Sequence, residues 1–162
     1  MQPRTAPRVT AASLTGGWRD VHVDQVGLAV AAIALASSTP AAAQTPAPAG
    51  AKVYFINLKN GSEVTSPSLV QFGLTDMGIA PAGVEKPNTG HHHLLIDAQL
   101  TEDQMKEAIP ADDTHKHFGG GQTEAMVTLP QGQHTLQLVL ADWTHIPHAP
   151  PVMSEPITIT VR

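Results

Sequence analysis

The sequence predicts an all-β domain, built as an immunoglobulin-like sandwich of two sheets. Short segments rich in Val, Leu, Ile and Thr alternate between apolar and polar residues, as half-buried strands do. The chain holds 14 Pro and 13 Gly, and many of them stand between these segments as turn residues. Only residues 100–109 have the features of a helix. A cupredoxin-like sandwich is the nearest alternative fold.

Two strands are expected at the start of the domain. Residues 53–58 read VYFINL and are followed by Asn60-Gly61, a dipeptide typical of tight turns. Residues 68–75 read SLVQFGLT, in which alternate side chains point to opposite faces. Residues 77–90 are rich in Gly and Pro, so a long ordered loop is expected before the next strand.

Further strands follow this loop. In the clearest of them Leu136, Leu138 and Leu140 share one face, as expected of a strand with one side in the core. Polar and Gly-rich residues 111–122 and Pro-rich residues 142–151 are expected to be loops. The strands are expected at residues 91–98, 123–129, 133–141 and 157–161.

One short helix is expected in the crossover after residues 91–98. Residues 100–109 read LTEDQMKEAI, and Thr101 is a suitable N-cap with acidic residues in the first turn. Pro110 would end this helix, because proline has no N–H for the next turn.

The first 43 residues are expected to be a signal peptide. Residues 26–36 read VGLAVAAIALA, an apolar run too short for a bilayer, which needs about 20 apolar residues. Ala41-Ala42-Ala43 then forms a cleavage site, with cleavage after Ala43. A periplasmic or secreted protein without a stable membrane anchor is expected. Residues 44–51, QTPAPAGA, read as a flexible Pro/Ala linker, and residues 52–162 as a single domain.

Composition excludes several classes of function. The chain has no cysteine, which rules out cysteine-ligated zinc, cysteine nucleophiles and the cysteine-containing type of blue-copper site. After cleavage six basic residues face twelve acidic ones, a net charge of about −6 that attracts cations. The basic residues are scattered, so a nucleic-acid partner is not expected.

Histidines are concentrated in three patches, at residues 91–93, 115–117 and 145–148. Side chains two apart on an extended segment point to the same side, so His91 and His93 can converge. His115 and His117 can converge in the same way if their segment is extended. His145 and His148 can join either pair, because loops gather at the ends of a sandwich. Neutral imidazole binds copper and zinc. The candidate metal ligands are His91, His93, His115, His117, His145 and His148.

Other polar residues near the patches can orient the ligands or bind a polar ligand themselves. Metal-bound histidines usually donate their second ring N–H to an acceptor. Each such residue also has a plainer interpretation, as a solvated loop charge, a turn cap or a packed side chain. Trp143 is either a contact platform or a side chain that packs over the end of a sheet. The candidates of this kind are His92, Asp97, Glu124 and Asp142.

Three stretches together resemble a known family. They are GVEKPNTGHHHLLID (residues 83–97), HKHFGGGQTE (115–124) and GQHTLQLVLADWTHIPHAPPVMSEPITITV (132–161). They are similar to domain-of-unknown-function family 4399, a family of small exported bacterial proteins. The resemblance covers nearly the whole mature domain. It implies export and the histidine pattern itself, and carries no established activity.

Three functions fit these observations. The first is an exported module that binds copper or zinc through the clustered histidines. The second is a metal-dependent hydrolase or oxidase at the same site, with Glu124 or Asp142 as general base. The third is a metal-free immunoglobulin-like module that binds a protein partner or a small polar ligand. No acid/base pair is fixed by spacing, so the sequence favours binding over catalysis.

Overall fold

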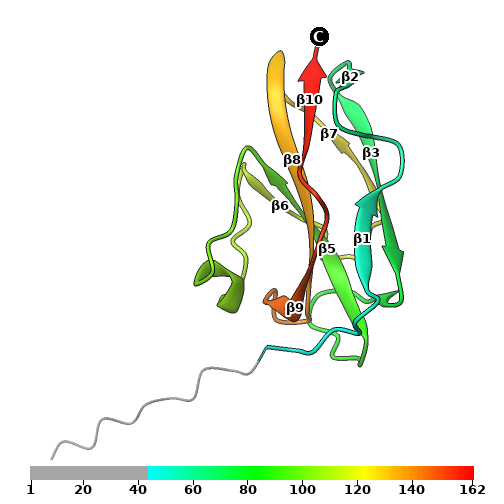
Figure 1. The fold of residues 1–162 in the computed structure, drawn as a ribbon, viewed down its shortest axis with the longest axis vertical. Helices are drawn as coiled ribbons and strands as arrows, with labels where there is room; N and C mark the ends of the chain where they lie inside the picture. The colour runs from blue at the N-terminus through cyan, green and yellow to red at the C-terminus, as the bar shows by residue number, and fades with distance from the viewer. Residues whose placement is uncertain (1–43) are drawn as a thin grey trace, which may run out of the picture. The chain divides into compact units, whose positions relative to one another are not determined.

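The computed structural model describes residues 44–162, and the expected signal peptide, residues 1–43, lies outside them. The described residues form ten strands and a single 3-10 turn (Figure 1). These elements are β1 (Lys52–Phe55), β2 (Ser62–Val64), β3 (Ser68–Thr75), β4 (Gly78–Ile79), β5 (Thr89–Ile96), η1 (Gln104–Lys106), β6 (His115–His117), β7 (Glu124–Val127), β8 (Gly132–Ala141), β9 (Pro147–Met153) and β10 (Ile157–Val161).

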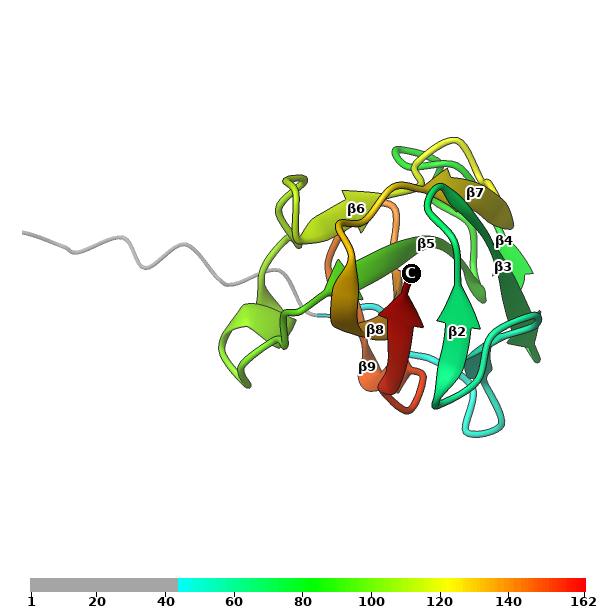
Figure 2. The ribbon, with the colours of Figure 1, turned by 90° about the horizontal axis from the view of Figure 1, so that it is seen from above.

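The strands form two sheets, so the predicted all-β sandwich is confirmed. The small sheet has the order β1-β3-β7, and all its pairings are antiparallel. The large sheet has the order β2-β10-β8-β5-β4, with β6 added to β5 and β9 added to β8. Figures 1 and 2 show the two layers, with β8 and β5 at the centre of the larger one.

The main core lies between the two sheets. Val70 and Phe72 reach it from β3, and Leu94, Leu138 and Ile159 reach it from the large sheet, each 2% exposed or less. These residues alternate along their strands, as a sandwich with one core-facing side per sheet requires. Burial of such apolar side chains is the main favourable term for this fold.

The helix expected over residues 100–109 is wrong. Thr101 and Gln104 do form the reciprocal hydrogen bonds of a helix start, at 2.9 and 3.3 Å, but only the turn Gln104–Lys106 follows. Glu107 is extended, and Ile109 donates its N–H to the carbonyl of His145 at 2.9 Å. The chain leaves the helical path because Ile109 is buried against the large sheet instead.

Three segments expected to be loops each contain a strand. Within residues 77–90 the short strand β4 pairs with β5 in parallel. β6 adds to β5 in antiparallel register, so part of residues 111–122 is extended. β9 reads PHAPPVM, and its prolines suggested a loop because they lack a backbone N–H. They are tolerated here because the other edge of β9 is bridged only at Ala149, which is not a proline and donates its N–H to the carbonyl of Thr45.

The start of the described chain is bound to the domain, whereas the sequence suggested a flexible linker. The side-chain amide of Gln44 donates to the carbonyls of Met105 and Pro147, at 2.7 and 2.9 Å. Pro46 forms a parallel bridge with Ala149 in β9. We call residues 44–47 the N-terminal segment.

A second apolar cluster covers the outer face of the large sheet. Residues 97–114, here called the crossover segment, connect β5 to β6 and lie on that side (Figure 1). The cluster joins this segment to β5 and β8, so all eight residues of β5 are buried. Its buried members are Leu95, Leu100, Ile109, Val139 and Ala141.

Truncation of Leu95 tests this second cluster. Leu95 is 0% exposed, so Leu95→Ala should lower the free energy of unfolding by about 2–5 kcal/mol, measured by urea denaturation. Leu69→Ala is the control, because Leu69 is 38% exposed and should change the free energy by less than about 0.5 kcal/mol. Equal, small effects of the two substitutions would show that the cluster does not stabilise the fold.

Candidate metal centre

Strand β5 supplies two of the clustered histidines. His91 and His93 point to the outer face of the large sheet with Leu95, because side chains alternate along a strand. Both rings are 0% exposed. His92 points the opposite way, into the main core, where its ring lies 5.1 Å from that of Phe72.

Strand β6 places His117 against these two rings. His117 is paired with His93 across the two strands, and its ring centroid lies 5.0 Å from those of His91 and His93. Gly119 permits this position. A Cβ at Gly119 would clash with Cε1 and Nε2 of the His117 ring. The run of glycines after β6 therefore leaves room for the ring.

A tight turn at residues 142–146 supplies the fourth histidine. The carboxylate of Asp142 fixes this turn. Its Oδ1 accepts hydrogen bonds from the N–H of Thr144 at 2.8 Å, from the Thr144 hydroxyl at 2.7 Å and from the N–H of Ile146 at 3.1 Å. His145 has a φ of 70°, a strained value for a residue with a side chain. The turn thus holds the His145 ring 4.7 Å from that of His117, centroid to centroid.

The N-terminal segment braces the same turn. The hydroxyl of Thr45 donates to Oδ2 of Asp142 at 2.6 Å, and Thr45 and Asp142 are 97 residues apart. Asp142 is 4% exposed. Burial acts to raise its pKa, but the hydrogen bonds from Thr45, Thr144 and Ile146 outweigh this and hold the pKa below its ordinary value. Asp142 is therefore a buried carboxylate in its ionised form at neutral pH.

The ring nitrogens of the four histidines converge on one point. Nε2 of His91 lies 3.1 Å from Nε2 of His93 and 3.2 Å from Nδ1 of His145. One nitrogen of a neutral ring has either one proton or one lone pair, so it cannot make both contacts as good hydrogen bonds. Nε2 of His117 is buried and has no hydrogen-bond partner within residues 44–162. Nε2 of His117 is therefore free to bind something else.

The spacing fits a small metal ion. A metal–nitrogen bond of about 2.0–2.1 Å in a tetrahedron puts neighbouring nitrogens about 3.3–3.4 Å apart. The two short distances are close to this value. One nitrogen from each of the four histidines lies within 4.8 Å of the others, so the widest pair would close by up to about 1.5 Å. The cluster can hold a metal ion through His91, His93, His117 and His145.

Burial keeps the rings neutral. It lowers the pKa of His91 to about 4, with further lowering by the nearby His117 and His145. It lowers the pKa of His93 to about 3, again helped by the neighbouring rings. The pKa of His117 is also lowered, by burial and by His145. Neutral imidazole is the form that binds metal, so little proton competition is expected near pH 7.

Two other candidate ligands lie outside the cluster. His115 shares a face of β6 with His117, but its Nδ1 lies 2.9 Å from a carboxylate oxygen of Asp112. His148 is fully buried in β9, with its Nδ1 3.2 Å from the carbonyl oxygen of Thr45. The structure therefore brings together four of the six candidates.

The residues considered as supporting groups have separate places. Asp97 accepts hydrogen bonds from His134 and from the N–H of Thr135, both at 2.7 Å. Glu124 accepts a hydrogen bond from the side chain of Gln71 on the exposed face of the small sheet. His92 contacts the carbonyl of Gln122 in the main core. Asp142 alone adjoins the cluster, through the turn that carries His145.

Sequence reasoning missed Thr45 as part of the site. It lies in a Pro/Ala segment with no periodicity, and its partner is 97 residues away, so no local pattern reveals it. The role of Gly119 is visible only in part, because a run of three glycines indicates close approach without naming the neighbour.

The apoprotein should lose stability as the pH falls from about 6.5 to about 4. The lowered pKa values of His91 and His93 mean that the unfolded chain binds more protons in this range, so acid favours unfolding. Each such histidine contributes up to about 1.4 kcal/mol per pH unit. The measurement is the free energy of unfolding with chelator present, at several pH values.

Two variants identify the source of this loss. His93→Leu should reduce the dependence of the free energy of unfolding on pH. The hydrogen bond to Asp97 raises the pKa of His134. The stability that His134 contributes is therefore present in acid and is lost as the pH rises, the opposite of the contribution of His93. The variant His134→Gln should therefore still lose stability in acid. A free energy that stays constant or increases on acidification to pH 4.5 would contradict the assignment.

Comparisons with known proteins place the chain in a family. A search of the curated proteins and a search of the solved structures found no match to the chain. The model of the domain of unknown function DUF4399 matches residues 70–162, which is more than half of the chain and includes all four clustered histidines. The chain therefore belongs to the DUF4399 family.

Proposed function

We propose that this domain binds one transition-metal ion, copper or zinc, through His91, His93, His117 and His145. One observation carries the proposal: four imidazoles from three separate segments present their nitrogens to one point, and two of the four are fully buried. A purely structural group of histidines would be expected to pair these nitrogens with carbonyl or carboxylate oxygens, as His134 does.

The ligand chemistry supports copper(II) or zinc. Imidazole suits both, and the cluster contains no thiolate or thioether, the ligands that select copper(I). The ion would bring two positive charges to four neutral rings. The ionised Asp142 is close enough to raise the pKa of His91, so its charge also favours a cation at the cluster. The acidic domain favours its approach.

The arrangement supports binding over catalysis. Four protein ligands complete a tetrahedral site, whereas catalytic zinc sites keep a position open for water or substrate. His91 and His93 are fully buried, which leaves their side of the site closed to substrate. We therefore propose a role in holding the ion, for storage, delivery or sensing.

Elemental analysis tests this function. Untagged protein, expressed from the full chain in metal-supplemented medium, should contain about one equivalent of copper or zinc. His93→Ala and His117→Ala should each weaken binding by more than the about 10–100-fold that loss of a ligand's hydrogen-bond partner costs. Metal should also raise the melting temperature of the wild-type protein, because it binds the folded state.

His115→Ala is the matched control. His115 lies on the same face of β6 as His117, two residues away, and Asp112 holds its ring. This variant should retain metal with nearly wild-type affinity. If His115→Ala lost metal as His117→Ala does, the proposed ligand set would be wrong. Metal far below one equivalent in the wild type would refute the metal site itself.

We further propose that the protein is exported and cleaved after Ala43. The described residues contain no helix that is both long and apolar enough to cross a bilayer. Cleavage at this point would leave Gln44 and Thr45 in place, and these two residues bind the crossover segment, β9 and Asp142. The resemblance of residues 26–43 to a signal peptide supports cleavage at the same position.

Cell fractionation and mass spectrometry test export. The protein expressed from the full chain in a bacterium should appear in the osmotic-shock fraction, with a mass that corresponds to residues 44–162. Replacing two residues of the apolar run with lysine, Ala31→Lys and Ile33→Lys, should keep the uncleaved chain in the cytoplasm. An unprocessed wild-type chain in the cytoplasm would contradict the proposal.

A further inference from the structure

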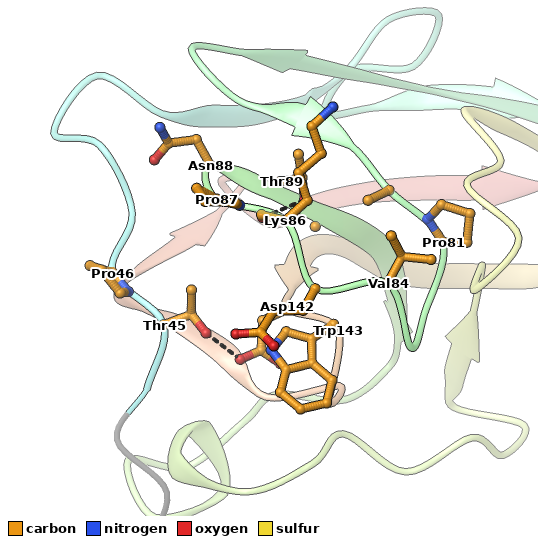
Figure 3. Close-up of a pocket in the computed structure, with 13 residues that line it drawn as sticks. Thr45, Pro46, Pro81, Val84, Lys86, Pro87, Asn88, Thr89, Asp142 and Trp143 are labelled. Atoms are coloured by element: carbon orange, nitrogen blue, oxygen red, sulfur yellow. Dashed lines mark hydrogen bonds between the residues drawn. The ribbon is translucent and has the colours of Figure 1, made fainter.

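A pocket adjoins the 142–146 turn, and none of the four clustered histidines lines it. Its volume is about 250 Å³. Most of its wall is apolar. Figure 3 shows the lining residues, which come from the N-terminal segment, the loop before β5 and the turn. The apolar ones are Pro46, Ala80, Pro81, Val84, Pro87 and Trp143.

The polar group at the base of this pocket is Asp142. Its carboxylate is 4% exposed and ionised, and its four hydrogen bonds come from uncharged donors. No ion pair within residues 44–162 includes it. A buried carboxylate is usually paired with a positive charge. Lys86 lines the same pocket, yet its side chain points away from Asp142 (Figure 3).

Two further residues favour a positive ligand. Trp143 is 39% exposed and lines the pocket next to Asp142, and the face of an indole ring attracts cations. Glu85 adds a second carboxylate to the lining. An apolar wall, an aromatic face and buried negative charge together match an organic ammonium ion, which has apolar substituents around a positive nitrogen.

We propose that this pocket binds a small organic cation, a substituted ammonium ion, with Trp143 against its apolar surface and Asp142 as its counter-charge. The inference does not depend on metal, because the pocket lining contains none of the four clustered histidines. It adds a second ligand of a different chemical class to the same domain.

Calorimetric titration with a matched pair of probes tests the proposal. Choline is the cation, and its uncharged carbon isostere, dimethylbutanol, has the same shape without the charge. The protein is titrated with chelator present, so the metal site takes no part. Choline should bind at least about tenfold more tightly than the isostere. Equal affinities would overturn the cation assignment, and the absence of binding by both would overturn the site.

Variants locate the binding. Trp143→Leu should weaken choline binding at least about tenfold, and Trp143→Phe, which keeps an aromatic face, should recover most of it. Glu85→Gln should weaken choline binding but leave binding of the isostere unchanged. Tyr54→Leu is the control, since Tyr54 is an exposed aromatic residue outside this pocket. If Trp143→Leu bound choline like the wild type, the pocket would not be the site.

His117→Ala separates this proposal from the metal site. The variant should bind choline with wild-type affinity even though it is expected to lose metal. Loss of choline binding in this variant, with its fold intact by circular dichroism, would show that the cation occupies the histidine cluster and would overturn the pocket assignment.

Discussion

Burial of both faces of β5 is the constraint on which the rest of the structure depends. One face lies in the core between the sheets, as in any sandwich. The other would be exposed to water if the crossover segment and the 142–146 turn did not cover it. Because of this cover, His91 and His93 lose contact with water, and their low pKa values follow from that loss. The covering turn also supplies His145, and the neighbouring strand β6 supplies His117.

Asp142 connects the parts of this cover. It fixes the turn that carries His145, accepts a hydrogen bond from the N-terminal segment, and forms the base of the apolar pocket. Its charge also acts on His91. A buried carboxylate with only neutral donors leaves negative charge uncompensated by any described side chain. This charge supports both proposed ligands, the metal ion at the imidazoles and the ammonium ion in the pocket.

The sequence predicted those parts of the fold that depend on alternation within one strand. The period of two placed Leu136, Leu138 and Leu140 in the core, and it placed His91 and His93 on one side with His92 on the other. The helix prediction failed because the local capping residues of η1 do not reveal that Ile109 packs against the sheet. β9 was missed because three prolines obscure a strand that only its pairing with β8 makes possible.

The choice among the candidate ligands was beyond local sequence. His115 and His117 lie on the same face of β6, but only His117 joins the cluster. The Asp112 carboxylate contacts the His115 ring, and Gly119 leaves room for the His117 ring. His145 and His148 differ because one lies in the turn and the other faces Thr45. Each distinction rests on a neighbour that the pattern of histidines does not specify.

The energetic state of the cluster argues for a ligand. A buried polar group without a partner costs about 1–3 kcal/mol, and Nε2 of His117 is such a group within the cluster. Apolar side chains at these positions would extend the second cluster, which begins at Leu95 on the same face. A fold that needed only stability would have no use for four imidazoles here. The proposed metal coordination would account for their convergence, because it converts the unfavourable burial of these nitrogens into bonds that only the folded chain can form.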